Sequence, residues 1–125
     1  MTPDYIHHIL VVDDVPVLAE MLAISLRGDT CDVTVASSAA EALRLARGLL
    51  FDLIISDLAM PGVDGYTLAK ELRAQPAYRK VPMIAITGFG NCEDERIWEA
   101  GFTECLSKPL ELDRLSEVVR KLLGK

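Results

Sequence analysis

The amino-acid sequence predicts an α/β domain, in which helices cover both faces of a doubly wound parallel sheet of five strands. Short, continuous apolar runs alternate with segments of helical periodicity, and the connections between them are short. No linker, internal repeat or low-complexity tract interrupts this alternation. With 125 residues, half of them hydrophobic, the chain is predicted to be a single domain that spans residues 1–125.

The predicted strands are apolar runs of only a few residues, rich in β-branched side chains. A parallel sheet is buried on both faces, so its strands are continuously apolar rather than alternating. Four runs have this character, and a weaker one is the candidate for a fifth strand. In chain order they are residues 9–12, 33–36, 53–55, 83–86 and 105–106.

Amphipathic helices are predicted between these runs. The first has Pro16 in its first turn and is expected to stop at Gly28. The second begins with Ser38 and Glu41 spaced as a capping box. The apolar residues at helical spacing that define the first helix are Val15, Leu18, Leu22 and Leu26.

Three further helices follow. Asp64 is placed to cap the third, which is expected to end before Pro76. Residues 94–100 predict a short fourth helix that is closed by Gly101. Apolar residues at helical spacing predict the fifth over residues 112–122.

Polar residues stand at the carboxyl ends of the predicted strands, where ligands bind in doubly wound sheets. Asp13 and Asp14 follow the first strand, and Asp57 follows the third. Thr87 follows the fourth strand, and Lys108 lies near the end of the fifth. The sequence therefore predicts that all five side chains meet at one edge of the sheet.

These residue types suit phosphoryl transfer. Two ionised carboxylates about 4 Å apart repel by roughly 4 kcal/mol at an effective dielectric of about 20, so three of them call for a divalent cation. Oxygen ligands favour Mg²⁺ or Ca²⁺, and a site with few protein ligands suits Mg²⁺. A carboxylate such as Asp57 can act as a nucleophile and become an acyl phosphate. Thr87 and Lys108 then supply donors to the phosphoryl oxygens.

Each of these residues also has a structural explanation when it is considered alone. Asp13 or Asp14 could cap the first helix, and Asp57 could belong to a turn before Pro61 and Gly62. A threonine after a strand is commonly structural, and a lysine before a proline is commonly a surface residue. Their joint placement at strand ends favours the functional interpretation.

Bulk composition excludes several classes of protein. The net charge of −6 and the pI of about 4.8 oppose binding to nucleic acid or to anionic lipid. No apolar stretch approaches the ~18 residues of a membrane span, and no signal peptide is apparent.

The three cysteines, Cys31, Cys92 and Cys105, do not form a pattern of close pairs, so we expect three reduced thiols in a cytoplasmic protein. Trp98 is expected to be a packing residue.

Four segments resemble the response-regulator receiver domain of two-component signalling, and the resemblance covers about residues 9–123. The segments occur in the family's order: residues 10–14 (LVVDD), 56–65 (SDLAMPGVDG), 85–88 (AITG) and 106–109 (LSKP). The resemblance implies a flavodoxin-like sheet with strand order 2-1-3-4-5. Residues 100–102 (AGF) followed by LSKP resemble receivers attached to hybrid histidine kinases.

The resemblance also implies roles for the residues of the site. Asp57 matches the phosphoacceptor, and Asp14 matches the acidic residue that binds Mg²⁺ directly. Asp13 matches the residue that acts on the metal largely through water, and the backbone carbonyl of Ala59 matches a further metal ligand. Thr87 matches the switch hydroxyl.

Lys108 matches the lysine that contacts the phosphoryl group, and its bond to Pro109 is commonly cis in similar domains. The sequence departs from the family's usual pattern at Cys105, where an aromatic residue or histidine is common. The interval from Thr87 to Lys108 is one residue shorter than usual. Ala59 and Phe89 place no polar side chain at two variable positions beside the site.

The predicted function is a phosphoryl-accepting signalling switch, not an enzyme that turns over a substrate. Its donor would be a histidine kinase or a histidine phosphotransfer protein, and phosphorylation would change the surface around the fourth helix and fifth strand. The chain ends soon after the fifth helix, so no output domain is expected. Two alternatives stay open: a Mg²⁺-dependent phosphatase with an Asp nucleophile, and a non-phosphorylated binding module. The sequence also leaves open whether the domain forms a homodimer.

Overall fold

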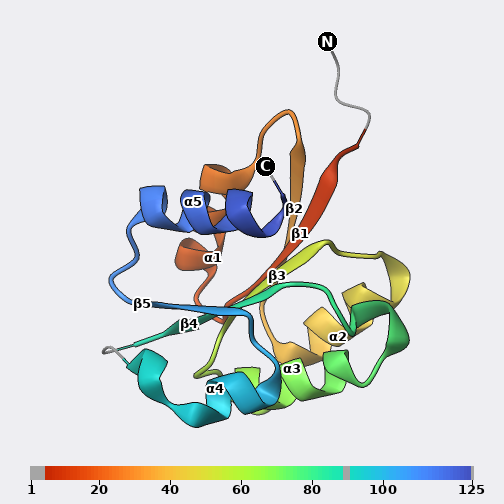
Figure 1. The fold of residues 1–125 in the computed structure, drawn as a ribbon, viewed down its shortest axis with the longest axis vertical. Coiled ribbons are helices and arrows are strands. Elements are labelled where there is room, and N and C mark those ends of the chain that lie inside the picture. The colour runs from red at the N-terminus through yellow and green to blue at the C-terminus, as the bar shows by residue number, and fades with distance from the viewer. Residues whose placement is uncertain (1–4, 89–90, 125) are drawn as a thin grey trace.

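The five predicted strands form one parallel sheet in the order β2-β1-β3-β4-β5 (Figure 1). A computed structural model describes residues 5–88 and 91–124. The strands are β1 (His7–Val12), β2 (Cys31–Ala36), β3 (Leu53–Asp57), β4 (Met83–Thr87) and β5 (Glu104–Ser107). The predicted fold class and flavodoxin-like strand order are therefore confirmed, and Asp57 and Thr87 are the last residues of their strands.

Helices cover both faces of the sheet. They form one layer on each side of the sheet in Figure 1, and each side encloses its own hydrophobic core. The first layer consists of α1 (Pro16–Leu26) and α5 (Leu112–Leu122), and the second of α2 (Ala39–Gly48), α3 (Gly65–Arg73) and α4 (Glu95–Ala100). Two short 3₁₀ helices that were not predicted are η1 (Pro76–Tyr78) and η2 (Asn91–Glu93). Within residues 5–88 and 91–124, none of the helices is long and apolar enough to cross a membrane.

The predicted helix caps are largely confirmed. The Ser38 hydroxyl accepts the Glu41 N–H at 3.1 Å, while the Glu41 carboxylate accepts from the N–H of Ser37 rather than Ser38. Asp64 caps α3 through the N–H of Thr67 at 2.8 Å. Gly101 ends α4 in the left-handed region, with φ of 107°. The capping residue of α4 is Asp94.

The prediction for α1 is only partly right. The helix ends at Leu26, and an extended Arg27 follows it, so Gly28 is not its C-terminal cap. Val15 and Leu18 are 41% and 37% exposed, although the apolar spacing placed them in the core. The stripe that packs on the sheet consists of Ala19, Leu22, Ala23 and Leu26. Because α1 is apolar on nearly every side, periodicity alone could not select the buried stripe.

Arg73 at the end of α3 holds the carboxyl end of α4. Its Nε and one terminal nitrogen donate to the Gly101 carbonyl at 3.1 and 2.7 Å. Its other terminal nitrogen donates to the carbonyls of Tyr78 and Val81 at 2.7 and 2.6 Å. Burial lowers the pKa of Arg73, and these carbonyls satisfy the guanidinium in its partly buried position. The end of α4 is therefore fixed to α3 and to the segment before β4.

Two expectations about side chains are wrong. Cys92 and Cys105 form a disulfide, and only Cys31 is free. Their spacing of 13 residues gave no sign of pairing, because the bond depends on how η2 packs beside β5. Trp98 on α4 is 46% exposed and is not a core residue.

Candidate functional site

The five polar residues predicted at strand ends lie together at the carboxyl edge of the sheet. Asp57 and Thr87 end β3 and β4, Asp13 and Asp14 directly follow β1, and Lys108 directly follows β5. An open cleft of about 1050 Å³ lies over this edge. Its lining includes Asp14, Asp57, Ala59, Thr87 and Lys108. The predicted convergence is therefore present in the folded chain.

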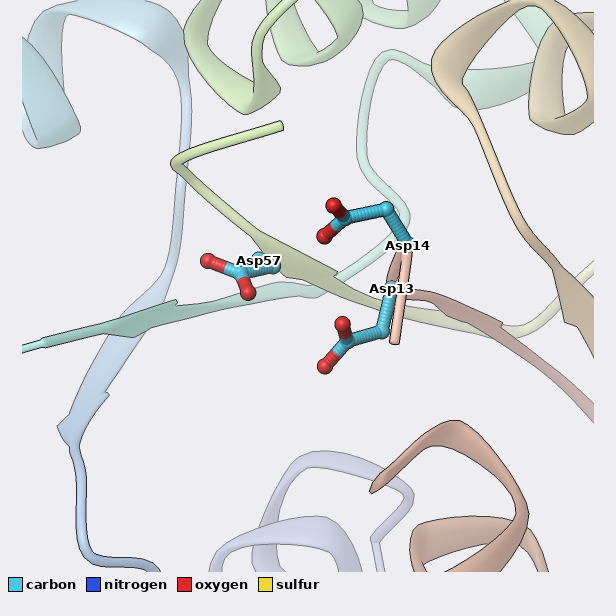
Figure 2. A group of neighbouring side chains, drawn as sticks. All are labelled: Asp13, Asp14 and Asp57. Atoms are coloured by element: carbon cyan, nitrogen blue, oxygen red, sulfur yellow. The ribbon is translucent and has the colours of Figure 1, made fainter. Parts of the chain in front are cut away.

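Three carboxylates form the acidic part of the site. Asp13, Asp14 and Asp57 each place an oxygen within 4.8 Å of the others, and Figure 2 shows the three groups close together. Asp13 and Asp57 are only 3% and 5% exposed, whereas Asp14 is half-buried and faces the cleft. Two of the three charges are therefore largely shielded from water, which strengthens their mutual repulsion.

Lys108 is the cation that compensates this charge directly. Its Nζ donates to Asp57 Oδ2 at 2.9 Å. Burial by itself would lower the pKa of Lys108, but the hydrogen bond to Asp57 and the nearby charges of Asp57, Asp13 and Asp14 raise it. The Ala59 N–H donates to the other oxygen, Asp57 Oδ1, at 3.1 Å. The Asp57 carboxylate is thus held from both sides, with lone pairs left on both oxygens.

Asp13 has weaker compensation than Asp57. Burial is the largest influence on its pKa and raises it, and the charges of Asp57 and Asp14 add to the rise. The Val15 N–H, which donates to Asp13 Oδ1 at 2.9 Å, and the charge of Lys108 lower the pKa. The pKa of Asp13 is therefore above its ordinary value, because the folded chain disfavours the ionised form.

Thr87 links the end of β4 to the residue that follows β5, beside the acidic cluster. Its side chain is buried and lines the cleft, and its hydroxyl donates to the Gly88 carbonyl at 3.3 Å. The Lys108 N–H donates to the Thr87 carbonyl at 2.8 Å, so the backbones of the two residues are joined. The Lys108–Pro109 bond is cis, as the resemblance implied. Phe89, the other variable position beside the site, lies outside the described residues.

The acidic cluster fits a hard divalent cation. Its donors are carboxylate oxygens, and one lysine leaves two of the three negative charges to be balanced. Asp14 and Asp57 face the cleft in which such an ion and its waters would lie, as does Ala59, whose carbonyl is the predicted backbone ligand. Asp13 lines a smaller hollow of about 290 Å³ on the other side of Lys108. Its action on a metal through water stays a prediction.

Two other residues of the cleft, Tyr66 of α3 and Arg96 of α4, were not predicted. The Arg96 guanidinium lies 4.8 Å from the centre of the Tyr66 ring. It also bonds to Asp94 at 2.7 Å, and hydrogen bonds from the Arg96 side chain and N–H lower the pKa of Asp94 to about 2. Arg96 therefore brings a second cation into the cleft, from the helix next to the site.

We expect Asp13→Asn to stabilise the metal-free protein by about 1 kcal/mol at neutral pH. Asparagine keeps the acceptor for the Val15 N–H but removes a buried charge that repels Asp14 and Asp57. Folding raises the pKa of Asp13, so the folded state favours the neutral carboxyl group. The contribution of Asp13 to stability is therefore fully present below pH 3.8, its ordinary pKa, and is lost as the pH rises through the raised pKa of the folded chain. The gain in Asp13→Asn should therefore be present at neutral pH and absent below 3.8.

Urea unfolding in EDTA at several pH values measures this difference. Excess Mg²⁺ should shrink the difference, because an ion bound at the carboxylates would stabilise the native state of the wild type. A variant less stable than the wild type in neutral EDTA would show that the Asp13 charge supports the fold.

Residues 9–120 match the response regulator receiver domain family. An uncharacterised 14.6 kDa protein of Leptolyngbya boryana is 41% identical over 111 residues, which cover 86% of this chain and 85% of the relative. The DNA-binding response regulator MtrA of Mycolicibacterium smegmatis is 38% identical over 118 residues, or 94% of this chain and 50% of MtrA. The chain spans about half the length of MtrA and a quarter of the response regulator PleD of Caulobacter vibrioides.

Solved structures with the same fold include the chemotaxis response regulator CheY4 of Vibrio cholerae. Its TM-score is 0.88 at 29% identity, covering 94% of this chain and 98% of CheY4. The receiver domain of the sensor histidine kinase PA1611 from Pseudomonas aeruginosa has a TM-score of 0.86 at 31% identity. That comparison covers 96% of this chain and 99% of the other, and the PA1611 structure has a magnesium ion coordinated in its active-site cleft. With its sheet order, its acidic cleft and its match over residues 9–120, the chain belongs to the response-regulator receiver domains.

Proposed function

We propose that this receiver domain is a signalling switch in which Asp57 accepts a phosphoryl group from a phosphohistidine donor with the help of Mg²⁺. The observation that carries the proposal is the Asp57 carboxylate, held by Lys108 at 2.9 Å inside a cluster of three carboxylates in an open cleft. The nucleophile, the compensating cation and the ligands of a divalent metal thus lie within reach of one incoming group.

The transfer forms one bond and breaks another. An oxygen of Asp57 attacks phosphorus as the P–N bond to the donor imidazole breaks, and the electron pair of that bond stays with the imidazole. Lys108 moves from the carboxylate toward the phosphoryl oxygens, and Thr87 donates its hydroxyl to them. A bound Mg²⁺ would neutralise charge on the transferring oxygens. The same groups assist hydrolysis, so the domain influences its own phosphorylation and dephosphorylation without turning over a substrate.

Phosphorylation should change the surface around α4 and β5. Thr87 exchanges its bond to the Gly88 carbonyl for a charge-assisted bond to the phosphoryl group. The backbone that leads from β4 toward α4 follows Thr87 directly, and Arg96 of α4 lines the same cleft. A negative charge in the cleft therefore acts on α4 through both residues.

The exposed face of α1 supports a protein donor rather than only a small-molecule one. Three apolar residues on this face are largely exposed, at 69%, 50% and 66%: Val17, Met21 and Ile24. The face continues into the hollow of about 290 Å³ whose lining includes Leu18, Met21 and Lys108. An exposed apolar surface beside a reactive site is a typical docking surface. We propose that a histidine kinase or histidine phosphotransfer protein covers it during transfer.

The acidic character of the chain bears on its other partners. A net charge of −6 opposes direct binding to nucleic acid and to anionic membranes. We propose that the domain lies in the cytoplasm, where a kinase or phosphotransfer protein would reach it.

The test is incubation with acetyl phosphate and Mg²⁺, followed by intact-mass measurement. We expect the wild type to gain one phosphoryl group and Asp57→Asn to gain none. EDTA should prevent the gain, because the metal can no longer balance the carboxylates.

The same experiment separates the two alternatives. Continuous release of inorganic phosphate from a phosphate ester, with no retained phosphoryl group, would indicate a phosphatase. Absence of any gain in the folded, Mg²⁺-saturated wild type would indicate a non-phosphorylated binding module.

A further inference from the structure

We infer that Cys92 and Cys105 form a redox-modification site, whose co-reactant is a low-molecular-weight disulfide and whose oxidation restrains α4. The restraint on the phosphoryl response rests on the function proposed above, but the chemistry of the thiols does not. Cys92 lies in η2 just before α4, and Cys105 lies in β5. Their Cα atoms are 5.7 Å apart, which is a normal separation for bonded cysteines.

Both cysteine residues are partly exposed. Each is half-buried rather than enclosed, whereas a disulfide sealed in a core would be protected from exchange. Oxidation begins when one thiolate attacks the reagent disulfide, forming a mixed disulfide and releasing one thiol. The second thiolate then attacks the bound protein sulfur, closes the Cys92–Cys105 bond and releases the second thiol. The protein loses two protons and two electrons, and the reagent is reduced to two thiols.

The bond joins the two segments that flank the phosphoacceptor site. Cys105 pairs with Ala85 in the β4–β5 register, and Ser107 pairs with Thr87. Directly after Ser107 comes Lys108, whose Nζ contacts Asp57 and whose N–H contacts the Thr87 carbonyl. Cys92 lies on the connection that leaves Thr87. The disulfide therefore ties the segment after the hydroxyl donor to the strand that precedes the lysine.

The bond also fixes the amino end of α4, whose carboxyl end is already held. Arg73 holds the Gly101 carbonyl with two hydrogen bonds at 3.1 and 2.7 Å. In the oxidised chain α4 is attached at both ends, through Arg73 and through the disulfide. In the reduced chain its amino end keeps only non-covalent contacts, such as the stacking of Arg96 on Tyr66. Reduction should therefore release the end of α4 that lies beside the cleft.

Thiol counting tests the redox site without using phosphorylation. The protein is equilibrated with mixtures of glutathione and glutathione disulfide, treated with maleimide without unfolding, reduced and weighed. Oxidised protein should carry one maleimide, on Cys31, and reduced protein up to three, because the chain has three cysteines. The matched control Cys31→Ser should lower both maleimide counts by one. The ratio of glutathione to glutathione disulfide at which half of the protein is oxidised should stay unchanged. The proposed site would be contradicted if Cys92 and Cys105 of the wild type reacted with maleimide in every glutathione mixture. It would also be contradicted if oxidation stopped at a mixed disulfide with glutathione.

Amide exchange tests the restraint on α4. The probe is beryllofluoride with Mg²⁺, applied to oxidised wild type, reduced wild type and Cys92→Ser. We expect exchange in residues 95–100 to change in the reduced wild type and in Cys92→Ser, and this response to be lost in the oxidised wild type. Equal responses in the oxidised and reduced wild type would overturn the coupling. Absence of any response around Asp57 in all three samples would instead contradict the proposed function, and thiol counting would still decide the redox site.

Discussion

Replacing Met21 or Ile24 with lysine is expected to slow phosphoryl transfer from a phosphohistidine donor protein by about tenfold or more. Both side chains lie on the exposed apolar face of α1, at 50% and 66% exposure. A donor that covers this face would have to bury the new ammonium group or lose the contact. The folded domain should tolerate the change, because neither side chain belongs to its core and lysine is a good helix former. Phosphorylation by acetyl phosphate should proceed as in the wild type, since that donor needs no protein surface.

The rates are measured with a phosphorylated histidine-containing domain that transfers to the wild type, and in parallel with acetyl phosphate. Leu50→Lys is the matched control, because Leu50 is also 66% exposed but lies before β3, at the opposite edge of the sheet from the cleft. It adds the same charge and should leave both rates unchanged. If Leu50→Lys slowed transfer from the donor protein equally, the effect would come from the added charge alone. If Met21→Lys or Ile24→Lys also slowed phosphorylation by acetyl phosphate, the effect would come from damage at Asp57.

Replacing Gly65 with alanine is expected to destabilise the domain by about 3 kcal/mol, or roughly 10 °C in melting temperature. Gly65 begins α3, and its N–H donates to the Leu58 carbonyl at 3.0 Å. A Cβ at this position would collide with the Asp57 carbonyl oxygen and lie 2.9 Å from the Leu58 Cα. Both obstacles are backbone atoms, so no side-chain rotation can relieve the contact. The helix start or the end of β3 must move, which should also displace Asp57 and slow its phosphorylation.

Thermal unfolding and the rate of acetyl phosphate labelling measure the two consequences. Gly48→Ala is the control, because a Cβ at Gly48 in α2 meets no atom within 4 Å. It should stabilise the domain by about 0.5 kcal/mol, since alanine is the better helix former. A Gly65→Ala protein with wild-type stability and labelling would show that the close approach at the start of α3 is easily relaxed.

The residues of the phosphoacceptor site could be predicted because their position depends on local features of the chain. Asp57 and Thr87 end apolar runs, and residues at the carboxyl ends of parallel strands share one edge of the sheet. Asp14 and Lys108 followed from the same rule, and their convergence needed no knowledge of side-chain packing. The capping residues Ser38 and Asp64 were predictable for a similar reason, because each acts on a backbone N–H three residues away.

Packing between distant segments determined the features that the sequence did not reveal. Arg96 and Tyr66 meet in the cleft only because α3 and α4 lie side by side, and nothing in the short helix around Arg96 marks it as facing the site. The exposure of Trp98 depends on the same arrangement, since a tryptophan among polar residues is consistent with either a core or a surface position.

By itself, the sequence determined the order of the elements, the edge of the sheet that carries the chemistry, and the residues able to perform it. Periodicity and strand-end positions are local properties, and the rules of parallel sheets convert them into one arrangement. Only the tertiary structure decided which stripe of α1 faces the solvent and that Cys92 bonds to Cys105. The physical reason is that an apolar helix has several faces of equal hydrophobicity, and that two cysteines bond only where packing brings their side chains together.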